Sequence, residues 1–571
     1  MSAPRPGDLV AISLSGVQVF ITESRTTADA ANASDIVGRL ASLVAARFTD
    51  EELVIPYRAR VAAAPNRIVA LVEPGTGAER ASGAVAAARQ TWQSWVERLF
   101  SSARETPGFP DLMWAVAPAS GDYTAQWEQV HTALSARKRL RGFDFPEAVD
   151  VGPCSLAPRW AAERRAPQGV PAHEQDQALS AAGWVKRRWH AHPALPSSST
   201  TGFASTSSIA STPYRIGVLR AWDLPDVRQN AVALHDAVRA VMGPGRFRFR
   251  EAPVPAVQLH RRDAEIARWW EDGAGPWVWP EAWQEERLTR EYGVGGHRVD
   301  PAAVRRGRAA ATALRESLEV EPNPYYAVLV ADLDSLGKVL SAAPVDPTRH
   351  RALSQRLGEL ARKQRREVEE GQGVAVYAGG DDLLAFTPAS TALEIAAACR
   401  DQAGADPTTL SCAVLFVHHI GSLRQAILQA QELLAAAKST PGKNAVAVGY
   451  LTGSGSRATT VRPWEAHPVG DALQALRTFR PVDALHTAGG LSPRLLNDLY
   501  RERWALADLA SIDRGRVYAK EVARLVVRHG GTEEDARILV GLGACEHAKP
   551  EWDPVPLEAA KVAVFLRRQT W

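Results

Sequence analysis

Cysteine is scarce in this chain, and its four copies are far apart. Cys154, Cys399, Cys412 and Cys545 form no Cys-x-x-Cys pair. This spacing excludes a disulfide scaffold and a cysteine-rich zinc framework, and it is typical of a reducing compartment. A single thiolate such as Cys154 cannot hold a structural zinc ion. We therefore expect no structural zinc.

Long hydrophobic runs are also missing. No run approaches the roughly 20 apolar residues that span a bilayer, and the N-terminus lacks the features of a signal peptide. The formal net charge is only +3, from 67 basic and 64 acidic residues. Overall charge therefore neither requires nor excludes a nucleic-acid partner. The sequence predicts a soluble, cytoplasmic protein without a membrane partner.

The 571 residues are too many for one domain, and three or four are expected. The pattern of apolar residues predicts an α+β protein with four regions. These are a mixed region 1–150, a helical and irregular region 151–315, a mixed region 316–460 and a mostly helical region 461–571. Within the second region, residues 196–213 are dense in Ser and Thr and are typical of a linker.

The third region has the clearest pattern. Its expected strands are 325–331, 374–378, 383–386, 410–417 and 444–451, and its expected helices are 353–370, 391–402 and 423–438. The order β-α-β-β-α-β-α-β contains the ferredoxin-like unit that palm domains use.

Two acidic clusters fall at equivalent ends of these strands. Asp332 and Asp334 end the first strand, and Asp381 and Asp382 occupy the tip of the hairpin between the next two. In a βαββ unit these strands are neighbours, so the clusters converge. Converging carboxylates repel one another, and hard cations such as Mg²⁺ relieve the repulsion. Two such ions promote in-line nucleotidyl transfer.

Glycines and lysines near these clusters fit the same chemistry. Gly379 and Gly380 let a triphosphate approach the hairpin backbone closely. Lys438 and Lys443 lie near the end of a later helix, where they can reach phosphates, and Lys438 is expected to neutralise the leaving pyrophosphate. The alternative is an acidic turn and an acidic strand end on a solvated surface. The combination of all these features favours the nucleotide site.

Several of these segments resemble one family. Residues 377–386, YAGGDDLLAF, resemble the GGDD hairpin of the large palm-domain subunit of type III CRISPR effector complexes. Residues 325–337, YYAVLVADLDSLG, are similar to that family's first palm strand. Residues 15–21, followed by Arg25-Thr26 and Asp29, resemble the opening signature of the III-B (Cmr) branch, and Pro65-Asn66-Arg67 is also similar.

The resemblance implies two ferredoxin-like palms, the first degenerate and the second with the GGDD hairpin, a helical insert and a helical C-terminal domain. It implies synthesis of cyclic oligoadenylates from ATP when target RNA binds, with two Mg²⁺ or Mn²⁺ ions. Asp332 and Asp381 are the first choices as metal ligands and Asp334 and Asp382 the second. Asp332, Asp381 and Asp382 are the expected catalytic residues. Ser335 and Gly337, together with the glycines and lysines above, are assigned to nucleotide binding.

The same resemblance implies macromolecular partners. These are the small-subunit filament, the subunit that holds the 5′ tag of the crRNA, the crRNA itself and the target RNA. Two departures from the family pattern affect other sites. The first palm begins near Met1, so we expect no HD nuclease domain, and His235-Asp236 has no companion histidines. The insert retains only Cys154 of the usual cysteine pairs, which implies a lost zinc site.

Two other functions remain open. One is a stand-alone diguanylate-type cyclase that uses GTP, although Leu383 stands where that hairpin usually has Phe. The other is a catalytically silent scaffold that organises RNA-binding subunits.

Overall fold

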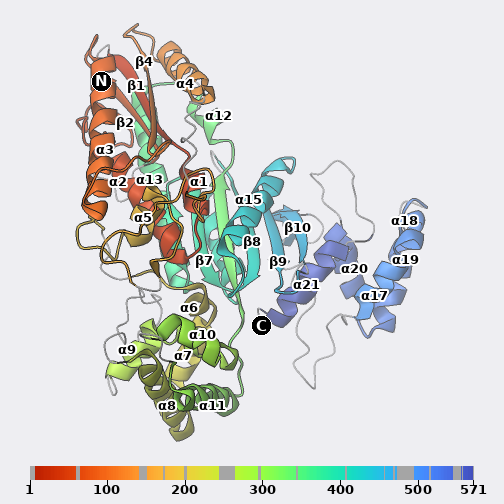
Figure 1. Ribbon diagram of the computed structural model, residues 1–571. Coiled ribbons are helices and arrows are strands. Elements are labelled where there is room, and N and C mark those ends of the chain that lie inside the picture. The colour runs from red at the N-terminus through yellow and green to blue at the C-terminus, as the bar shows by residue number, and fades with distance from the viewer. Residues whose placement is uncertain are drawn as a thin grey trace.

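The computed structural model describes most of the chain and contains two large β-sheets surrounded by helices, together with a small two-stranded sheet (Figure 1). The described residues are 7–59, 65–140, 151–171, 174–197, 202–243, 264–293, 298–342, 345–404, 408–455, 457–466, 470–471, 494–512, 516–543, 555 and 557–569. The fold is α+β, as the sequence predicts. Among the described helices, none combines the length and the apolar character needed to cross a membrane.

The first sheet belongs to the N-terminal palm. Its elements are β1 (Asp8–Ser15), α1 (Val17–Thr22), α2 (Thr27–Ala45), β2 (Leu53–Ile55), β3 (Arg67–Val72), α3 (Gly77–Phe100), β4 (Asp111–Ala117) and α4 (Tyr123–Arg139). The strand order is β2-β3-β1-β4, and β1 pairs antiparallel with both β3 and β4. Alternate residues of β1 face opposite cores: Val10 and Ile12 pack toward α2 and α3, while Leu9 and Ala11 pack toward α4. The sheet is therefore covered on both faces.

The second palm repeats this topology and extends it. Its elements are β5 (Tyr325–Leu333), α12 (Leu336–Leu340), α13 (Pro347–Glu370), β6 (Val374–Ala378), β7 (Asp382–Pro388), α14 (Ala392–Ala403), β8 (Leu410–His418), α15 (Leu423–Ser439), β9 (Ala445–Leu451) and β10 (Arg457–Pro463). The order β10-β9-β8-β5-β7-β6 contains the same ferredoxin-like arrangement in its last four strands. β10 crosses the expected domain boundary at residue 460, and the short strands β11 (Glu465–Ala466) and β12 (Gly470–Asp471) follow it.

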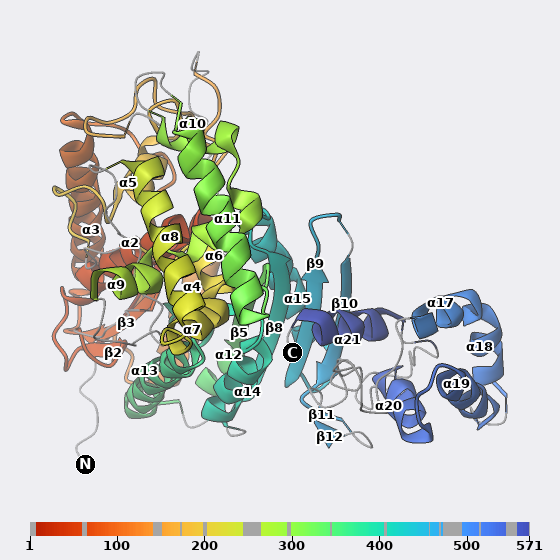
Figure 2. The same cartoon turned by 90° about the horizontal axis from the view of Figure 1, so that it is seen from below.

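Helices form the two remaining regions. The insert contains α5 (Ala181–Arg188), α6 (Thr206–Ala210), α7 (Thr212–Arg220), α8 (Pro225–Met242), α9 (Ala264–Asp272), the 3-10 helices η2 (Gly275–Trp277) and η3 (Pro280–Ala282), α10 (Glu285–Tyr292) and α11 (Pro301–Leu318). The C-terminal region contains α17 (Arg494–Arg501), α18 (Arg503–Ala510), α19 (Arg516–Arg528), α20 (Glu533–Gly543) and α21 (Leu557–Gln569). Figure 2 shows α17 to α20 to one side of the palms, with α21 beside the second sheet. Phe565 of α21 stacks on Tyr450 of β9 at 4.4 Å, which joins the two regions.

The expected linker at residues 196–213 is wrong for the part that forms α6 and the start of α7. Ser205 caps α6 through a hydrogen bond from the amide of Ser208. The α6 hydroxyls of Thr206 and Ser207 reach the carbonyl oxygen and Nδ1 of His419, at 2.7 and 2.8 Å. These Ser and Thr side chains therefore cap a helix and dock the insert on the second palm. Residues 198–201 lie outside the described residues.

Ionic contacts join α5 of the insert to the first palm, close to Cys154. Asp29, which closes the capping box of α2, also accepts bonds at 2.7 and 2.9 Å from the guanidinium of Arg187. The buried ammonium of Lys186 donates to the carbonyls of Phe20 and Glu23 at 2.9 and 2.5 Å. Burial lowers the pKa of Lys186 to about 8. Cys154 is buried against Gly183 of α5, and among the described residues no group of three His, Cys, Asp or Glu side chains is already arranged to hold a metal ion. The absence of structural zinc stays a prediction.

Candidate nucleotidyl-transfer site

The strand register of the second palm brings three carboxylates together. In the antiparallel pairing of β5 with β7, Asp332 lies directly opposite Asp382. The amide of Leu333 donates to the carbonyl of Asp381 at 2.9 Å, which holds the hairpin tip against the end of β5. Residues directly opposite in a sheet have Cβ atoms about 5 Å apart. The backbone itself therefore gathers Asp332, Asp381 and Asp382.

The two glycines are needed to form this hairpin. The amide of Gly379 donates to the carbonyl of Asp382 at 2.9 Å and closes the turn. Gly380 has a φ of 106°, a backbone conformation that side chains disfavour. A Cβ at Gly379 would overlap the phenol of Tyr377. Both glycines thus have a conformational role, and their contact with a triphosphate stays a prediction.

Electrostatic repulsion is strong in this cluster. Burial, then the carboxylates of Asp381 and Asp332, raise the pKa of Asp382 to about 8. Burial and Asp332 also raise the pKa of Asp381, although Arg67 and Lys438 act in the opposite direction. Carboxylates that resist simultaneous ionisation favour a hard divalent cation with oxygen ligands. The donor set therefore fits Mg²⁺ or Mn²⁺, and Asp332, Asp381 and Asp382 would hold it.

We expect Asp382→Asn to stabilise the fold at neutral and alkaline pH without divalent metal. The folded state raises the pKa of Asp382 to about 8, so it favours the protonated carboxyl. The contribution of this carboxyl to folding stability is therefore complete below the unfolded pKa of about 4 and is lost as pH rises through 8. The variant should unfold at a midpoint a few degrees above wild type at pH 8, corresponding to about 1 kcal/mol, and at the same midpoint at pH 4. Thermal unfolding of the full chain in a chelator measures this. A lower midpoint at pH 8 would contradict it.

Lysines already contact the acidic residues or the following loop. The ammonium of Lys438 forms an ion pair with Oδ1 of Asp332 and lies 3.4 Å from the carbonyl oxygen of Leu333. Lys443 donates to the hydroxyl of Ser335 at 3.2 Å. Ser335 has a φ of 58° and caps α12. Lys438 bonds only one oxygen of Asp332, so its ammonium would share this carboxylate with a bound metal ion, and no three metal-ligating side chains are already arranged as a cage among the described residues.

Asp334 does not join the other carboxylates. Only 4% of it is exposed, and its oxygens accept hydrogen bonds from Thr409 Oγ1 at 2.7 Å, Ser411 Oγ at 2.9 Å and the amide of Asn444 at 3.0 Å. These bonds tie the end of β5 to the starts of β8 and β9. The contacts argue against the prediction that Asp334 binds metal and assign it a structural role. Its donors lie 75 residues or more away in the sequence, so the Asp-x-Asp pattern alone does not reveal them.

A cavity of about 260 Å³ opens beside Asp381 and is closed by the first palm. Its second-palm wall comes from α12, α13 and Gly379, and its first-palm wall is formed by residues 55–57 and 65–67. Arg67 lies in this wall and lowers the pKa of Asp381. Its guanidinium forms no hydrogen bond or ion pair with the residues that the structure describes. The first palm thus contributes a cation to the acidic site, which the sequence had not identified as a site residue.

The two palms differ in the residues that pair at the ends of their central strands, β1 and β5. Ser13 pairs with Arg67 in the first sheet as Asp332 pairs with Asp382 in the second. The first palm therefore has a hydroxyl and a guanidinium where the second has two carboxylates. A cation at that position opposes metal binding, which agrees with the expectation that the first palm is degenerate.

Comparisons with known proteins also identify the segment from β5 to β9 as a palm domain. Residues 325–447 match the family model "Cas10/Cmr2, second palm domain". The matched Cas10/Cmr2 palm region begins at β5, includes the hairpin with Asp381 and Asp382, and ends within β9. The chain is also 33% identical over 214 residues to the CRISPR system Cmr subunit Cmr2 of Pyrococcus furiosus. That alignment covers 32% of this chain and spans only 24% of the relative's length.

Solved structures extend the likeness in fold beyond the second palm. A cryo-EM structure of the type III-B Cmr-beta bound to cognate target RNA contains a chain with a TM-score of 0.63 and 13% identity. The match covers 98% of this chain and 83% of that chain. The apo state of Cmr-beta gives a TM-score of 0.61 at 13% identity and covers 98% and 82%. The architecture of two palms with helical additions is therefore shared.

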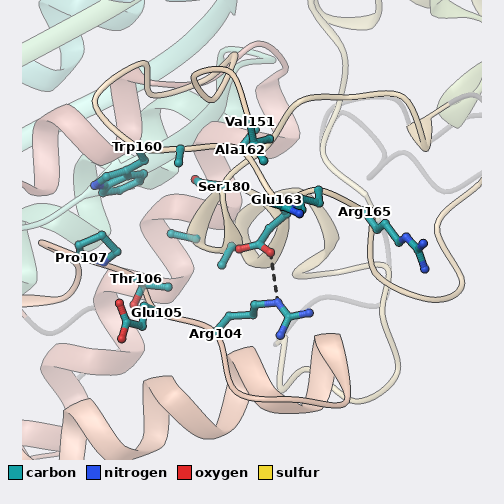
Figure 3. A pocket seen from close by; sticks show the side chains of 14 residues that line it. Arg104, Glu105, Thr106, Pro107, Val151, Trp160, Ala162, Glu163, Arg165 and Ser180 are labelled. Atoms are coloured by element: carbon teal, nitrogen blue, oxygen red, sulfur yellow. Dashed lines mark hydrogen bonds and ion pairs between the residues drawn. The ribbon is translucent and has the colours of Figure 1, made fainter. Parts of the chain in front are cut away.

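A larger hollow of about 570 Å³ lies elsewhere, between the first palm and the insert (Figure 3). Trp160 and Pro107 line it, and Arg104 pairs with Glu163 across it at 3.1 Å. None of the carboxylates that the second palm gathers line this hollow. The candidate site is therefore the smaller cavity, which Asp381 lines.

Proposed function

We propose that the chain is the large subunit of a type III-B CRISPR effector complex and synthesises cyclic oligoadenylates from ATP when target RNA binds. The observation that carries this proposal is the convergence of Asp332, Asp381 and Asp382 beside a cavity that Arg67 closes. Similarity of the second palm to Cas10/Cmr2 supports the same assignment.

The proposed reaction joins two nucleotides at a time. The 3′-oxygen of one ATP bonds to the α-phosphorus of another, the α–β phosphoanhydride bond breaks, and pyrophosphate leaves. A final attack by the terminal 3′-oxygen on the 5′ α-phosphorus closes the ring and releases the last pyrophosphate. Bound divalent ions would lower the pKa of the attacking hydroxyl and stabilise the leaving charge.

Residues of the chain supply the surrounding geometry. Asp332, Asp381 and Asp382 would hold the ions, and Gly379 and Gly380, which carry no side chains of their own, form the turn that the phosphates would approach. Lys438 is close enough to Asp332 to neutralise phosphate charge at the same place. Within the part of the chain that the structure describes, no general base is evident beside these carboxylates, so bound ions would have to activate the hydroxyl.

The proposed partners are the small-subunit filament, the subunit that holds the 5′ tag of the crRNA, the crRNA and the target RNA. The structural neighbour of the Cmr-beta complex is described as bound to cognate target RNA, which supports an RNA-dependent role. We place the complex in the cytoplasm.

Incubating the purified complex with labelled ATP or GTP tests this proposal. Each reaction is run with and without target RNA, and with Mg²⁺, Mn²⁺ or a chelator. We expect cyclic products from ATP only, dependent on metal and strongly increased by target RNA. Products from GTP that do not depend on RNA would indicate the diguanylate-type cyclase. No product with the full complex and cognate RNA would indicate the silent scaffold.

Replacing Lys438 with alanine is expected to weaken ATP binding more than turnover. If the ammonium meets phosphates in both the ground and transition states, the KM for ATP should rise about tenfold while kcat stays within about threefold. Steady-state kinetics of the complex measure both constants, and Lys363→Ala, at an exposed position of α13, is the matched control. A large fall in kcat at unchanged KM would contradict this role.

A further inference from the structure

α12 forms one wall of the cavity but has little packing of its own. The helix has five residues, none of which is buried, and Leu336, Gly337 and Leu340 line the cavity beside Asp381. An isolated helix of this length is not stable in water. The position of α12 therefore depends on contacts at its two ends.

The N-terminal end is held within the second palm, through the bond from Lys443 to Ser335. The C-terminal end is held by a histidine at the start of α13. His350 is 1% exposed, and its Nε2 lies 2.8 Å from the carbonyl oxygen of Leu340. Because a carbonyl only accepts hydrogen bonds, Nε2 carries the proton. The Leu340 carbonyl is thus fixed by a buried donor.

The other nitrogen of this ring contacts the first palm. Nδ1 of His350 lies 2.9 Å from the hydroxyl of Tyr123 on α4. With its proton on Nε2, the neutral ring accepts at Nδ1, so the Tyr123 hydroxyl donates. The indole of Trp127, also on α4, packs 3.9 Å from the imidazole. A continuous chain of bonds therefore runs from the first palm through His350 to α12.

Neighbouring contacts make the same junction rigid. Arg351 donates to the carbonyl of Leu53 in β2 at 2.6 Å, and the amide of Tyr57 donates to Ser354 at 3.1 Å. Arg349 donates to the carbonyl of Ala342 just beyond α12. The side chain of Leu340 packs against the apolar cluster under α4. The first turns of α13 thus form hydrogen bonds with both the first palm and the end of α12.

We propose that His350 is a positioning residue for nucleotidyl transfer, through which α4 of the first palm fixes the α12 wall of the reaction cavity. The inference rests on the proposed function for its effect on catalysis. The degenerate first palm thereby has a role that needs no metal ligand. Its Tyr123 orients the imidazole of His350, and this imidazole orients α12. A displacement of α12 moves Gly337 and Leu340 relative to Asp381, and small misplacements slow chemistry more than binding.

Tyr123→Phe tests this with little disturbance, because the ring remains and only the hydroxyl is lost. In the complex, kcat should fall about fivefold while the KM for ATP changes less than twofold. His350→Ala, which loses both bonds, should lower kcat about tenfold, and His350→Gln should restore part of it because the amide still donates to Leu340. His131→Gln is the matched control, since His131 also lies on α4 and packs on Trp127.

Hydrogen–deuterium exchange of the full chain gives a readout that does not require activity. Amides of residues 336–342 should exchange about fivefold faster in Tyr123→Phe than in wild type and His131→Gln. Unchanged exchange in Tyr123→Phe and His350→Ala would overturn the inference, as would faster exchange with unchanged kcat. If the wild type makes no product at all, the proposed function fails, and the exchange experiment still decides whether His350 holds α12.

Discussion

Replacing Asp381 and Asp382 together with alanine is expected to abolish nucleotide synthesis, by at least about a thousandfold. The pairing of β5 with β7 places these side chains with Asp332 at one point, so their loss removes most of the negative charge that would hold a divalent ion. Both are half-buried at a hairpin tip and contribute nothing to the apolar core. The fold and assembly of the complex should therefore persist.

Labelled ATP, target RNA and the assembled complex measure this effect, with circular dichroism and gel filtration as checks of fold and assembly. The control is Glu369→Ala with Glu370→Ala, which removes the same charge at the end of α13 and should keep full activity. Synthesis by the Asp381/Asp382 variant at the wild-type rate would place the reaction elsewhere.

Replacing Arg187 with methionine is expected to lower the free energy of unfolding by about 3–5 kcal/mol. The reason is the buried pair with Asp29, whose side chain is 0% exposed. Burial raises the pKa of Asp29, but Arg187, together with Lys186 and the amide of Arg25, outweighs burial, so the pKa of Asp29 lies below its usual range. Removing Arg187 leaves this charge buried without its partner. Asp29→Asn combined with Arg187→Met should cost less than Arg187→Met alone.

Denaturant unfolding of the full chain measures these differences. Arg39→Met is the control, because Arg39 pairs with Asp35 on the same α2 in a partly exposed position and should cost less than about 1 kcal/mol. A chelator should leave all midpoints unchanged if no structural zinc is present. Equal effects of Arg187→Met and Arg39→Met would show that the buried pair does not hold α5 on the first palm.

The sequence predicts most of the second palm because its strands are apolar and bounded by turns. It does not predict β2 of the first palm, which has only three residues, Leu53–Ile55, or β10 of the second, where Arg457 and Thr459 are exposed. β4 was also missed, since Asp111–Ala117 has no clear alternation. The C-terminal region at 461–571 was expected to be mostly helical, yet β10 enters it.

The acidic cluster is predictable from local signals, but its surroundings are not. Asp332, Asp381 and Asp382 are marked by strand ends and a glycine turn. The structural role of Asp334 depends on Thr409, Ser411 and Asn444, which approach only after the sheet forms. The contribution of Arg67 depends on how one palm docks against the other. Contacts of this kind are set by tertiary packing, and no spacing in one sequence specifies them.

Helix α13 connects the first palm to the strand that precedes the acidic hairpin. Its 24 residues correspond to a rod of about 36 Å, gripped at its first turns by the N-terminal palm and leading at its far end, through Gly371 and Gly373, into β6. From β6 the chain passes directly to the acidic hairpin. A tilt of about 5° at one end of a 36 Å rod displaces the other by about 3 Å, more than the roughly 2 Å between Mg²⁺ and its ligands. Because Ala361 and Val368 also pack α13 on the second palm, the helix links the docking of the first palm to the position of the acidic hairpin.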